Sequence, residues 1–437
     1  MYLAILLESG KKNIIYDAVK NAYIEIPNNI YQKCKLDSSG RLLSESEIDL
    51  LTMLFGRNIF QKYSFEITPP FSKNTLATLA LHNCSQLVLS ITERCNMRCE
   101  YCGYHSRYEK RYCEKEMPLD VAFQSIYYYL QNTIGLQEIV ITFYGGEPLL
   151  RFDFIQKCID FALKNSRGQN IRFLIATNVT LLNEEIIDFL YKNNVLVSVS
   201  LDGPRNLHDR YRFFKGGLPT YDCVIENLKK IYYKYPEYFL SHFVILPVYA
   251  PPYNDAVLCD YFENFPLDFL LGELYVTPYF KTVLSAKGKY DNIIFNREQK
   301  NKFEKFNKIN QDSLYKYKNL ITSPTLLTKT FPGGNCIPGC RKLYVNAKGE
   351  FYVCEKVPEN KEGCIGNIKQ GIDKELLYNQ YVNATNKYKT LNCKSCWAVH
   401  FCSSCFRNIN SITSSQCDKI KTRVKKDMEL ALQEVEI

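Results

Sequence analysis

The sequence predicts an α/β protein built on a mostly parallel sheet. From residue 86 onward, apolar runs of strand length alternate with segments of helical periodicity. This alternation implies parallel strands with helices packed outside them. The chain has 437 residues, of which 46% are apolar. It is therefore long and apolar enough to bury the cores of two or three domains.

The repeat gives the expected elements in order. Strands are expected at residues 86–93, 138–144, 170–177, 195–201, 240–248 and 270–277. Helices are expected at residues 118–131, 153–165, 182–193, 220–235 and 254–264, with one more at 297–309 outside the repeat. Functional groups on such sheets gather at the carboxyl ends of the strands, so the segments that follow the strands are the candidate sites.

The first 80 residues have a different pattern. Three strands and a short helix are expected at residues 2–8, 13–17, 22–26 and 28–34. Ser44 and Glu47 form a capping box that begins a helix over residues 48–55, and residues 66–85 form a linker. Short strands followed by helices resemble the winged-helix peptide-binding domain at the front of many peptide maturases. This resemblance implies that a leader peptide binds as an added strand. A structural cap on the rest of the fold is the alternative.

Three thiols follow the first strand of the repeat. Cys95, Cys99 and Cys102 are separated by three and two residues. This spacing lets all three bind one face of an iron–sulfur cube and leaves one iron open. An iron with an open position can bind a small molecule and pass it an electron. The alternatives are a zinc site completed by His105, or part of a disulfide framework.

The order of these thiols resembles the motif of the radical S-adenosylmethionine (radical SAM) enzymes, Cys-x-x-x-Cys-x-x-Cys with an aromatic residue before the last Cys. Tyr101 has that place and is a candidate cofactor contact. The resemblance implies a partial (β/α)6 TIM-like barrel. It also implies that the open iron binds the amino and carboxylate groups of SAM. Reduction then cleaves SAM to methionine and a 5'-deoxyadenosyl radical, which removes a hydrogen from the substrate.

Two further segments after strands strengthen the resemblance. Residues 145–148 read Gly-Gly-Glu-Pro, in which the glycines allow a close backbone approach and Glu147 can hold an ammonium group. Residues 177–180 read Thr-Asn-Val-Thr where the family has Thr-Asn-Gly-Thr, so Val179 departs from the motif. The resemblance assigns cofactor binding to Gly145, Gly146, Glu147, Thr177 and Asn178.

The fourth strand is followed by Ser-x-Asp-Gly and then by His-Asp-x-x-Arg, which resemble segments of the same family. Ser200 and Asp202 are candidates for polar contacts with SAM or the substrate. Arg212 is expected to pair with the SAM carboxylate through two parallel hydrogen bonds. For His208 and Asp209, a helix-cap or loop hydrogen bond is the preferred interpretation.

Eight more cysteines lie toward the C-terminus, at Cys336, Cys340, Cys354, Cys393, Cys396, Cys402, Cys405 and Cys417. They are enough for two four-ligand sites, and spacing alone does not separate structural zinc from iron. The arrangement resembles the SPASM domain, except that two residues rather than three separate Cys402 from Cys405. The resemblance implies two auxiliary 4Fe–4S clusters. One takes Cys336, Cys354 and Cys405, with Cys340 as the candidate fourth ligand; without Cys340, this cluster has an open iron that could bind a substrate thiolate. The other takes Cys393, Cys396, Cys402 and Cys417.

Composition limits the remaining function classes. The formal charge is +9 with no long basic run, so a nucleic-acid partner is not indicated. The N-terminus lacks the features of a secretory signal, and no apolar run approaches the roughly 20 residues of a membrane span. A cytoplasmic location without membrane contact is therefore expected. Thiols stay reduced there, so 18 cysteines indicate metal sites rather than disulfides. Most of the seven cysteines outside the motifs, at 34, 84, 113, 158, 223, 259 and 364, are expected to be buried hydrophobes.

These observations predict an enzyme of three parts: a leader-peptide recognition module (1–80), a radical SAM partial barrel (81–310), and a bridging region with a SPASM domain (311–437). The chain resembles maturases of cysteine-rich ribosomal peptides. That resemblance implies an oxidoreductase that takes hydrogen from the core of a precursor peptide in the barrel and installs a cross-link, here a Cys thioether. It would use SAM, three 4Fe–4S clusters and an external one-electron reductant. No catalytic acid or base is assigned.

Three alternatives remain open at this point. The enzyme could form a carbon–carbon or ether cross-link. It could instead oxidise a Cys or Ser to formylglycine, as sulfatase activators do. A zinc-bearing peptide-binding protein is the alternative that is not an enzyme.

Overall fold

A computed structural model describes most of the chain. The described residues are 2–8, 12–34, 42–55, 60, 62–102, 115–248, 257, 260–261, 329–332, 337–402, 404 and 412–434. The predicted strand at 270–277 and the predicted helix at 297–309 lie outside them. The predicted helix at 254–264 is described only at residues 257, 260 and 261, which are helical. No helix in the described part of the chain is long and apolar enough to cross a membrane.

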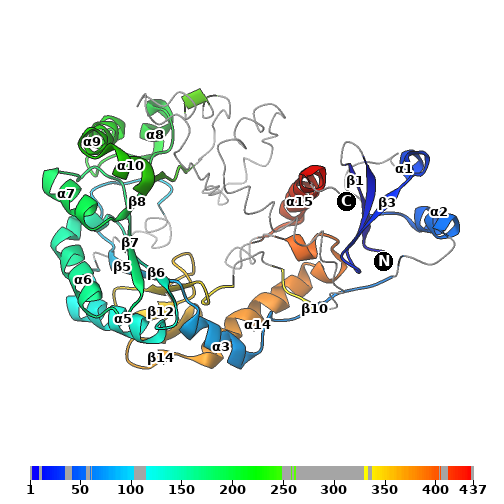
Figure 1. Cartoon of the computed structure of the whole chain (residues 1–437), viewed down its shortest axis with the longest axis horizontal. Helices are drawn as coiled ribbons and strands as arrows, with labels where there is room; N and C mark the ends of the chain where they lie inside the picture. Colours follow the sequence, from blue (N-terminus) through cyan, green and yellow to red (C-terminus); the bar gives the residue numbers. More distant parts are fainter. Residues whose placement is uncertain are drawn as a thin grey trace. The chain divides into compact units, whose positions relative to one another are not determined.

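The chain divides into two compact units (Figure 1). The first, called the terminal unit, contains Met1–Leu76, Asn310–Pro338 and Lys374–Ile437. The second, called the sheet unit, contains Ala77–Ile309 and Gly339–Asp373. The units change at residues 76/77 and 309/310, close to the predicted divisions at 80 and 310, but the first and last parts of the chain belong to one unit. The two ends of the chain share one core, and residues 339–373 extend the central sheet.

In the sheet unit, nine described strands form one mixed sheet in the order β14-β13-β12-β11-β5-β6-β7-β8-β9. Neighbours from β11 to β9 are parallel, and neighbours from β14 to β11 are antiparallel. The strands are β5 (Gln86–Thr92), β6 (Glu138–Gly145), β7 (Asn170–Thr177), β8 (Leu196–Val199), β9 (Phe243–Ile245), β11 (Lys342–Val345), β12 (Glu350–Tyr352), β13 (Cys364–Asn367) and β14 (Gly371–Ile372).

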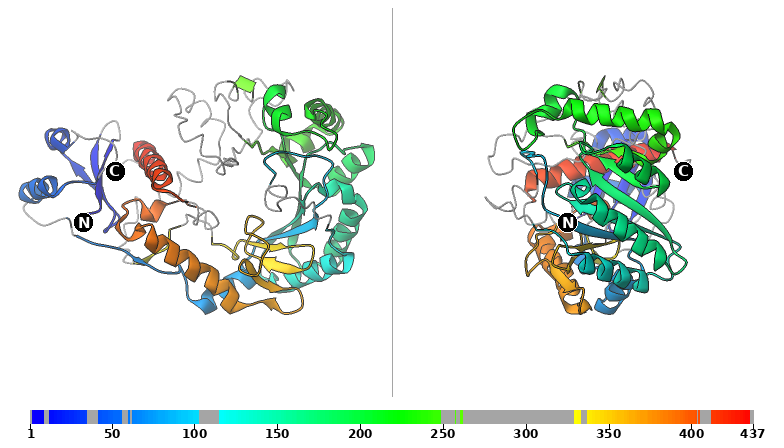
Figure 2. Two further views of the ribbon diagram at one scale, coloured as in Figure 1. Left: turned by 180° about the vertical axis from the view of Figure 1, so that it is seen from behind. Right: turned by 90° about the vertical axis from the view of Figure 1, so that its left-hand side faces the viewer.

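Helices alternate with the parallel strands, which confirms the predicted α/β class. They are α5 (Leu119–Asn132), η1 (Pro148–Arg151), α6 (Phe152–Lys164), α7 (Glu184–Lys192), α8 (Arg205–Tyr211), α9 (Tyr221–Lys234) and α10 (Pro236–His242). Figure 2 shows α5, α6 and α7 along one side of the strands. Helix α3 (Lys73–His82) precedes β5.

The two faces of β5 are both buried but carry different side chains. Leu87, Leu89 and Ile91 are fully buried. The residues between them project to the opposite face. On that face, Gln86 Nε2 donates to Thr142 Oγ1 of the neighbouring strand β6 at 2.8 Å. One face is therefore an apolar core, and the other carries polar groups toward the strand ends.

One predicted strand is shorter than expected. The sequence predicts a strand over 240–248, but β9 covers only Phe243–Ile245 because α10 occupies the residues before it. Pro236 lies in the first turn of α10, where its missing N–H has no hydrogen bond to lose.

The terminal unit contains a three-stranded antiparallel sheet in the order β1-β2-β3. Its elements are β1 (Ala4–Glu8), β2 (Asn13–Asp17), β3 (Ala22–Ile26), α1 (Asn28–Cys34), α2 (Glu45–Phe55), β4 (Glu66–Ile67), β10 (Lys329–Thr330), α14 (Lys374–Thr390), η3 (Cys393–Ser395), η4 (Val399–Phe401) and α15 (Ser414–Glu434). The predicted capping box is confirmed. The Ser44 amide donates to Glu47 Oε2 at 2.6 Å, and the Glu47 amide donates to Ser44 Oγ at 3.3 Å.

Strand β1 shows how the terminal unit is held together. Ile5 and Leu7 pack in one apolar cluster with Trp397 and Met428 from the C-terminal segment. Ala4, on the opposite face, belongs to a second cluster formed with α1 and α2. Because strand side chains alternate in direction, the sheet is buried on both faces. The N-terminal strands are therefore part of the C-terminal core.

Candidate cofactor site and thiol clusters

Backbone contacts that only glycine permits join the ends of β5 and β6. A Cβ on Gly145 would lie 2.0 Å from the carbonyl oxygen of Thr92, and one on Gly146 would lie 2.2 Å from that of Arg94. The Gly146 amide donates to the Thr92 carbonyl at 2.7 Å, and the Glu147 amide donates to the Arg94 carbonyl at 2.8 Å. The sequence predicts that these glycines approach a ligand. The structure shows that they approach the backbone leading into the three-Cys loop.

Glu147 is a fully buried carboxylate fixed by three donors. Its oxygens accept hydrogen bonds from Thr177 Oγ1 at 2.7 Å, the Leu149 amide at 3.0 Å and the Asn178 amide at 2.8 Å. Burial nevertheless raises the pKa of Glu147 above its ordinary value. An ammonium group supplied by a ligand would offset this cost, because a nearby positive charge favours the ionised carboxylate.

Asn178 connects the end of β7 to the three-Cys loop. Its Nδ2 donates to Asn96 Oδ1 at 2.9 Å and lies 3.9 Å from Cys95 Sγ. Its Oδ1 accepts from the Thr180 amide at 3.0 Å. The Met97 amide also donates to Cys95 Sγ, at 3.4 Å. Asn178 therefore positions a thiol that the sequence predicts as a cluster ligand. The sequence assigns no role to Asn96, and it assigns none to Thr180 although Thr180 is the last residue of the Thr-Asn-Val-Thr segment.

The three predicted ligands of the first cluster lie near one another. The charges of Cys99 and Cys102 both contribute to raising the pKa of Cys95, and the charge of Cys102 contributes to raising that of Cys99. Burial raises the pKa of Cys95 to about 12 and also raises that of Cys99. Thiols of this kind stay protonated and unreactive unless a cation compensates the thiolate charge. Among the described residues, no group of three His, Cys, Asp or Glu side chains is arranged to hold a metal ion.

A buried cation stands beside Cys99. Arg212 Nη1 donates to the Tyr101 hydroxyl at 2.7 Å, and that hydroxyl donates to Asp202 Oδ2. Asp202 Oδ1 lies 4.0 Å from Arg212 Nη1 and accepts from the Val248 amide at 3.0 Å. Arg212 Nε is buried and has no hydrogen-bond partner in the described part of the chain. One network therefore joins the predicted residues Tyr101, Asp202 and Arg212. Arg212 Nε remains as a buried donor that can bind an anionic ligand.

His208 and Asp209 have the structural roles that the sequence favours. His208 Nδ1 accepts the Asp202 amide at 3.3 Å, and its Nε2 lies 3.1 Å from Thr220 Oγ1. Burial, together with the nearby Arg212, lowers the pKa of His208 well below its ordinary value, so the ring is neutral. Asp209 Oδ1 accepts the Thr220 amide at 2.9 Å, at the N-terminus of α9.

Ser200 lies at the same end of the sheet. Its amide donates to the Thr177 carbonyl at 3.1 Å, and its side chain is partly buried. Val179, the departure from the family motif, has φ = 55° and is fully buried. It therefore adopts the left-handed conformation that a glycine would adopt without strain.

Val179 allows a test of this strain. Valine in the left-handed region costs about 1–2 kcal/mol, and its buried side chain contributes about 1.5–3 kcal/mol. We expect Val179→Ala to lower the free energy of unfolding by about 2 kcal/mol, and Val179→Gly to be no less stable than Val179→Ala. At Val197, a buried residue of β8, we expect glycine to be less stable than alanine by about 1 kcal/mol. Chemical denaturation of the four variants measures both differences. The same order of stability at both positions would contradict the strain argument.

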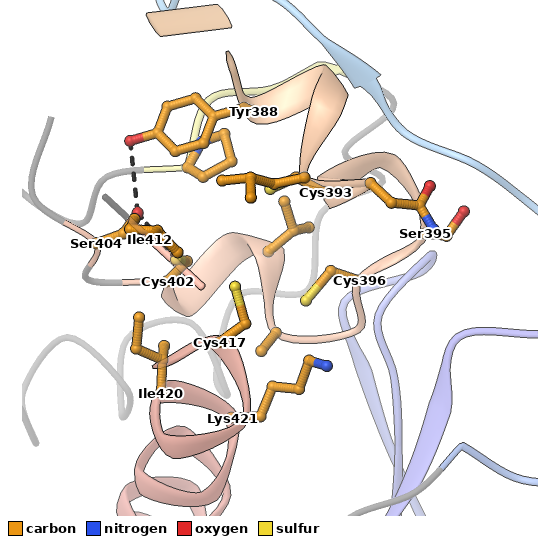
Figure 3. A pocket seen from close by; sticks show the side chains of 15 residues that line it. Tyr388, Cys393, Ser395, Cys396, Cys402, Ser404, Ile412, Cys417, Ile420 and Lys421 are labelled. Carbon is orange, nitrogen blue, oxygen red and sulfur yellow. Dashed lines mark hydrogen bonds between the residues drawn. The ribbon is translucent and has the colours of Figure 1, made fainter. Parts of the chain in front are cut away.

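In the terminal unit, four predicted ligands line one cavity of about 160 Å³. They are Cys393, Cys396, Cys402 and Cys417. Figure 3 shows the sulfur atoms of Cys396, Cys402 and Cys417 directed into a shared space, with the Lys421 side chain alongside. Burial raises the pKa of Cys393 to about 12 and that of Cys396 to about 11. The structure therefore brings together the four residues predicted to bind one auxiliary cluster.

The other predicted auxiliary set is only partly described, because Cys336 and Cys405 lie outside the described residues. Cys340 is buried, and the Gly339 amide donates to the Val353 carbonyl at 3.3 Å, next to Cys354. Strand β11 pairs with β5, and this pairing brings Cys340 near Cys84. Cys84 is buried, as predicted. Cys158 is buried too, whereas Cys223 and Cys364 are partly exposed. Cys34, Cys113 and Cys259 lie outside the described side chains.

The chemical types of these donors fit the groups that the sequence predicts. Buried thiols with raised pKa values are suited to a cationic cluster, because metal binding requires and stabilises thiolates. Glu147 provides a carboxylate for an ammonium group, and Arg212 Nε provides a buried donor for a carboxylate. An amino acid with both charged groups would satisfy both residues.

Comparison with known proteins gives a family match over the same region. Residues 89–256 match the model of the radical SAM superfamily. The chain is 29% identical over 328 residues to an uncharacterised protein of Methanocaldococcus jannaschii, covering 74% of this chain and 97% of that one. It is 34% identical over 181 residues to a serine-type anaerobic sulfatase-maturating enzyme of Bacteroides thetaiotaomicron, covering 40% of this chain and 39% of the relative.

The solved structures agree on the fold. The anSMEcpe structure with bound AdoMet and the Kp18Cys peptide superposes with a TM-score of 0.57 at 23% identity, covering 80% of this chain and 97% of the other. The family match and the solved structures agree on one point: residues 89–256 of this chain are similar to the radical SAM superfamily, and the fold around them is shared.

Proposed function

We propose that this chain is a radical SAM oxidoreductase that modifies a ribosomally made peptide, and that its product carries a Cys thioether. The observation that carries the proposal is the grouping, at one end of the sheet, of the three-Cys loop, Glu147 and the Arg212 network. When bound, the 4Fe–4S cluster and SAM supply a 5'-deoxyadenosyl radical that removes a hydrogen atom from the peptide.

The residues of the chain have separate roles in this proposal. Cys95, Cys99 and Cys102 hold the cluster. Glu147 receives the SAM ammonium group, and Arg212 receives the SAM carboxylate through its free Nε. Gly145 and Gly146 keep the strand ends in contact, so that these groups stay at fixed distances.

The role of Glu147 gives a pH prediction. Burial raises its pKa, so its protonated form is favoured in the folded protein, and this contribution to stability is lost as pH rises through the folded-state pKa. A bound ammonium group favours the ionised form. We therefore expect SAM affinity to increase as pH rises above about 4.5, the ordinary value for a glutamate. Glu147→Gln should weaken SAM binding roughly tenfold to a hundredfold and flatten this increase.

Equilibrium binding of SAM to the reconstituted protein between pH 5 and 8 measures the effect. Asp202, whose pKa burial also raises, is the matched control. Asp202→Asn should leave most of the pH dependence in place. An unchanged pH dependence in Glu147→Gln would show that another group binds the ammonium.

Two observations support a peptide substrate delivered by a leader. The curated relatives include maturating enzymes that act on sulfatases, and the anSMEcpe structure contains a bound peptide. The superposition includes 97% of the anSMEcpe chain but only 80% of this chain. This chain therefore has additional residues. In the described part of the chain, β3 pairs only with β2, so its other edge can receive an added strand.

Formylglycine formation is the second candidate, favoured by the names of these relatives. Deletion of residues 1–80 is not a clean test of the choice, because Ile5 and Leu7 pack against Trp397. Deleting these residues would expose the apolar core that packs against Cys393 and Cys396. The leader should instead be removed from the substrate.

The decisive experiment uses reduced, reconstituted enzyme with SAM and a cysteine-containing precursor peptide, with and without its leader. A thioether predicts a product lighter by two hydrogens, with one fewer alkylatable thiol, formed only when the leader is present. A product that reacts with a carbonyl reagent and forms without the leader would favour formylglycine. An unchanged peptide mass would end the cross-linking proposal.

Metal analysis tests the cofactor content separately. Three 4Fe–4S clusters, one bound by Cys95, Cys99 and Cys102 and two by the C-terminal thiols, predict roughly twelve irons per chain. Two or three zinc ions in place of iron would instead support a zinc-bearing peptide-binding protein.

A further inference from the structure

The positive charge of the chain is concentrated in one segment. Residues 387–426 contain nine Lys or Arg and a single acidic residue, Asp418. The segment therefore has a formal charge of +8, against +9 for the whole chain. An ordinary solvated surface mixes both signs, so a bias of this size indicates a surface that attracts an anionic partner.

The structure places four of these cations at or beside the cavity lined by the four C-terminal thiols. Lys389 lies in the last turn of α14, shortly before cavity residues Leu391 and Asn392, and Lys394 lies between cavity residues Cys393 and Ser395. On α15, Lys419 lies next to cavity residue Ile420, and Lys421 itself lines the cavity (Figure 3). Lys389, Lys394, Lys419 and Lys421 are together called the basic rim.

The basic rim is accessible. Lys389, Lys394 and Lys419 are exposed, and the side chain of Lys421 is 36% exposed. Asp418 pairs with Lys421 at 3.1 Å and is itself 69% exposed, so one carboxylate offsets only part of the charge. Exposed charges at the edge of an interface mainly set the rate and the salt dependence of association.

We propose that the basic rim is the docking surface for an acidic one-electron carrier protein, which exchanges electrons at the cavity of the four thiols. This inference rests on the proposed function, which requires such exchange. Forming a thioether removes two hydrogen atoms from the peptide. One goes to 5'-deoxyadenosine, and the other leaves as a proton and an electron. The outgoing electron balances the electron that cleaves SAM, so a carrier that donates the first can accept the second.

A flavodoxin with an acidic surface is the probe. Its binding to the reconstituted enzyme is measured by titration calorimetry from 20 to 300 mM salt, with both proteins oxidised so that no turnover occurs. We expect affinity to fall steeply as salt rises, because screening weakens contacts between exposed charges. The variant Lys389→Glu/Lys394→Glu/Lys419→Glu should bind at least about tenfold more weakly at low salt.

The matched control makes the same change in net charge elsewhere. Lys157, Lys164 and Lys192 are exposed residues of α6 and α7 in the sheet unit. Replacing all three by Glu should change flavodoxin affinity less than twofold. Equal losses in the two triple variants would show a net-charge effect and overturn the docking site. So would binding that does not depend on salt.

Two further measurements separate this proposal from others. If the rim variant loses affinity for the precursor peptide but not for flavodoxin, the rim binds the peptide and the carrier proposal is wrong. The proposed function can be wrong while the docking site is correct. In that case flavodoxin binding still depends on the basic rim, but the mass of the precursor peptide does not change.

Discussion

Replacing Gly146 with alanine is expected to destabilise the protein and to lower the iron content, because the three-Cys loop is the proposed site of one cluster. The added Cβ would lie 2.2 Å from the Arg94 carbonyl oxygen and 2.7 Å from that of Glu93. Both obstacles are backbone atoms directly before Cys95, so they cannot move aside without moving the loop. We expect a loss of about 3 kcal/mol or more in the free energy of unfolding.

Gly216 provides the control for this substitution. A Cβ there would meet nothing within 4 Å. Gly216→Ala should change stability by less than about 0.5 kcal/mol and leave the iron content unchanged. Thermal denaturation and iron analysis of both variants measure the two effects. If Gly146→Ala kept its full iron content, the contact between the strand ends would not be what positions the loop.

Removing the charge of Arg212 is expected to have the second large effect, on both stability and SAM binding. Arg212 and Asp202 are both nearly fully buried and lie 4.0 Å apart. Breaking a buried pair leaves an uncompensated charge, which typically costs about 3–5 kcal/mol. We therefore expect Arg212→Met to be destabilised by about this amount and to lose measurable SAM binding.

The double variant Arg212→Met/Asp202→Asn separates the two effects. Without the Asp202 charge, much of the lost stability should return, because no buried ion remains unpaired. SAM binding should not return, because the donor for its carboxylate is still missing. Denaturation and SAM titration of the single and double variants test this. Recovery of binding along with stability would show that Arg212 acts only through the fold.

Several features of the site could be predicted from short stretches of sequence. The spacing of Cys95, Cys99 and Cys102 indicates that they converge, and the segments after β6, β7 and β8 contain the residues that form the site. One prediction needed revision, and two glycines have a role that the sequence does not show. Gly145 and Gly146 contact the backbone that leads into the three-Cys loop. The strand predicted over 240–248 shortens because a helix begins at Pro236.

Other features depend on residues that are far apart in the chain. Asn178 reaches Cys95 from 83 residues away, and Arg212 reaches Tyr101 from 111 residues away. No local sequence pattern predicts these two contacts. They follow from the register of parallel strands, which sets the side chains that stand opposite each other at the strand ends.

The sequence by itself determined the α/β class, the identity of the thiol motifs and the place of each motif after a strand. All three depend on local periodicity and spacing, which a chain expresses before it folds. The tertiary structure decided which distant parts share a core. It joined the N-terminal strands to the segment around Trp397, because one apolar face of β1, with Ile5 and Leu7, is covered by residues from the other end of the chain. It also gathered the dispersed lysines around one thiol cavity, where their charges can act together.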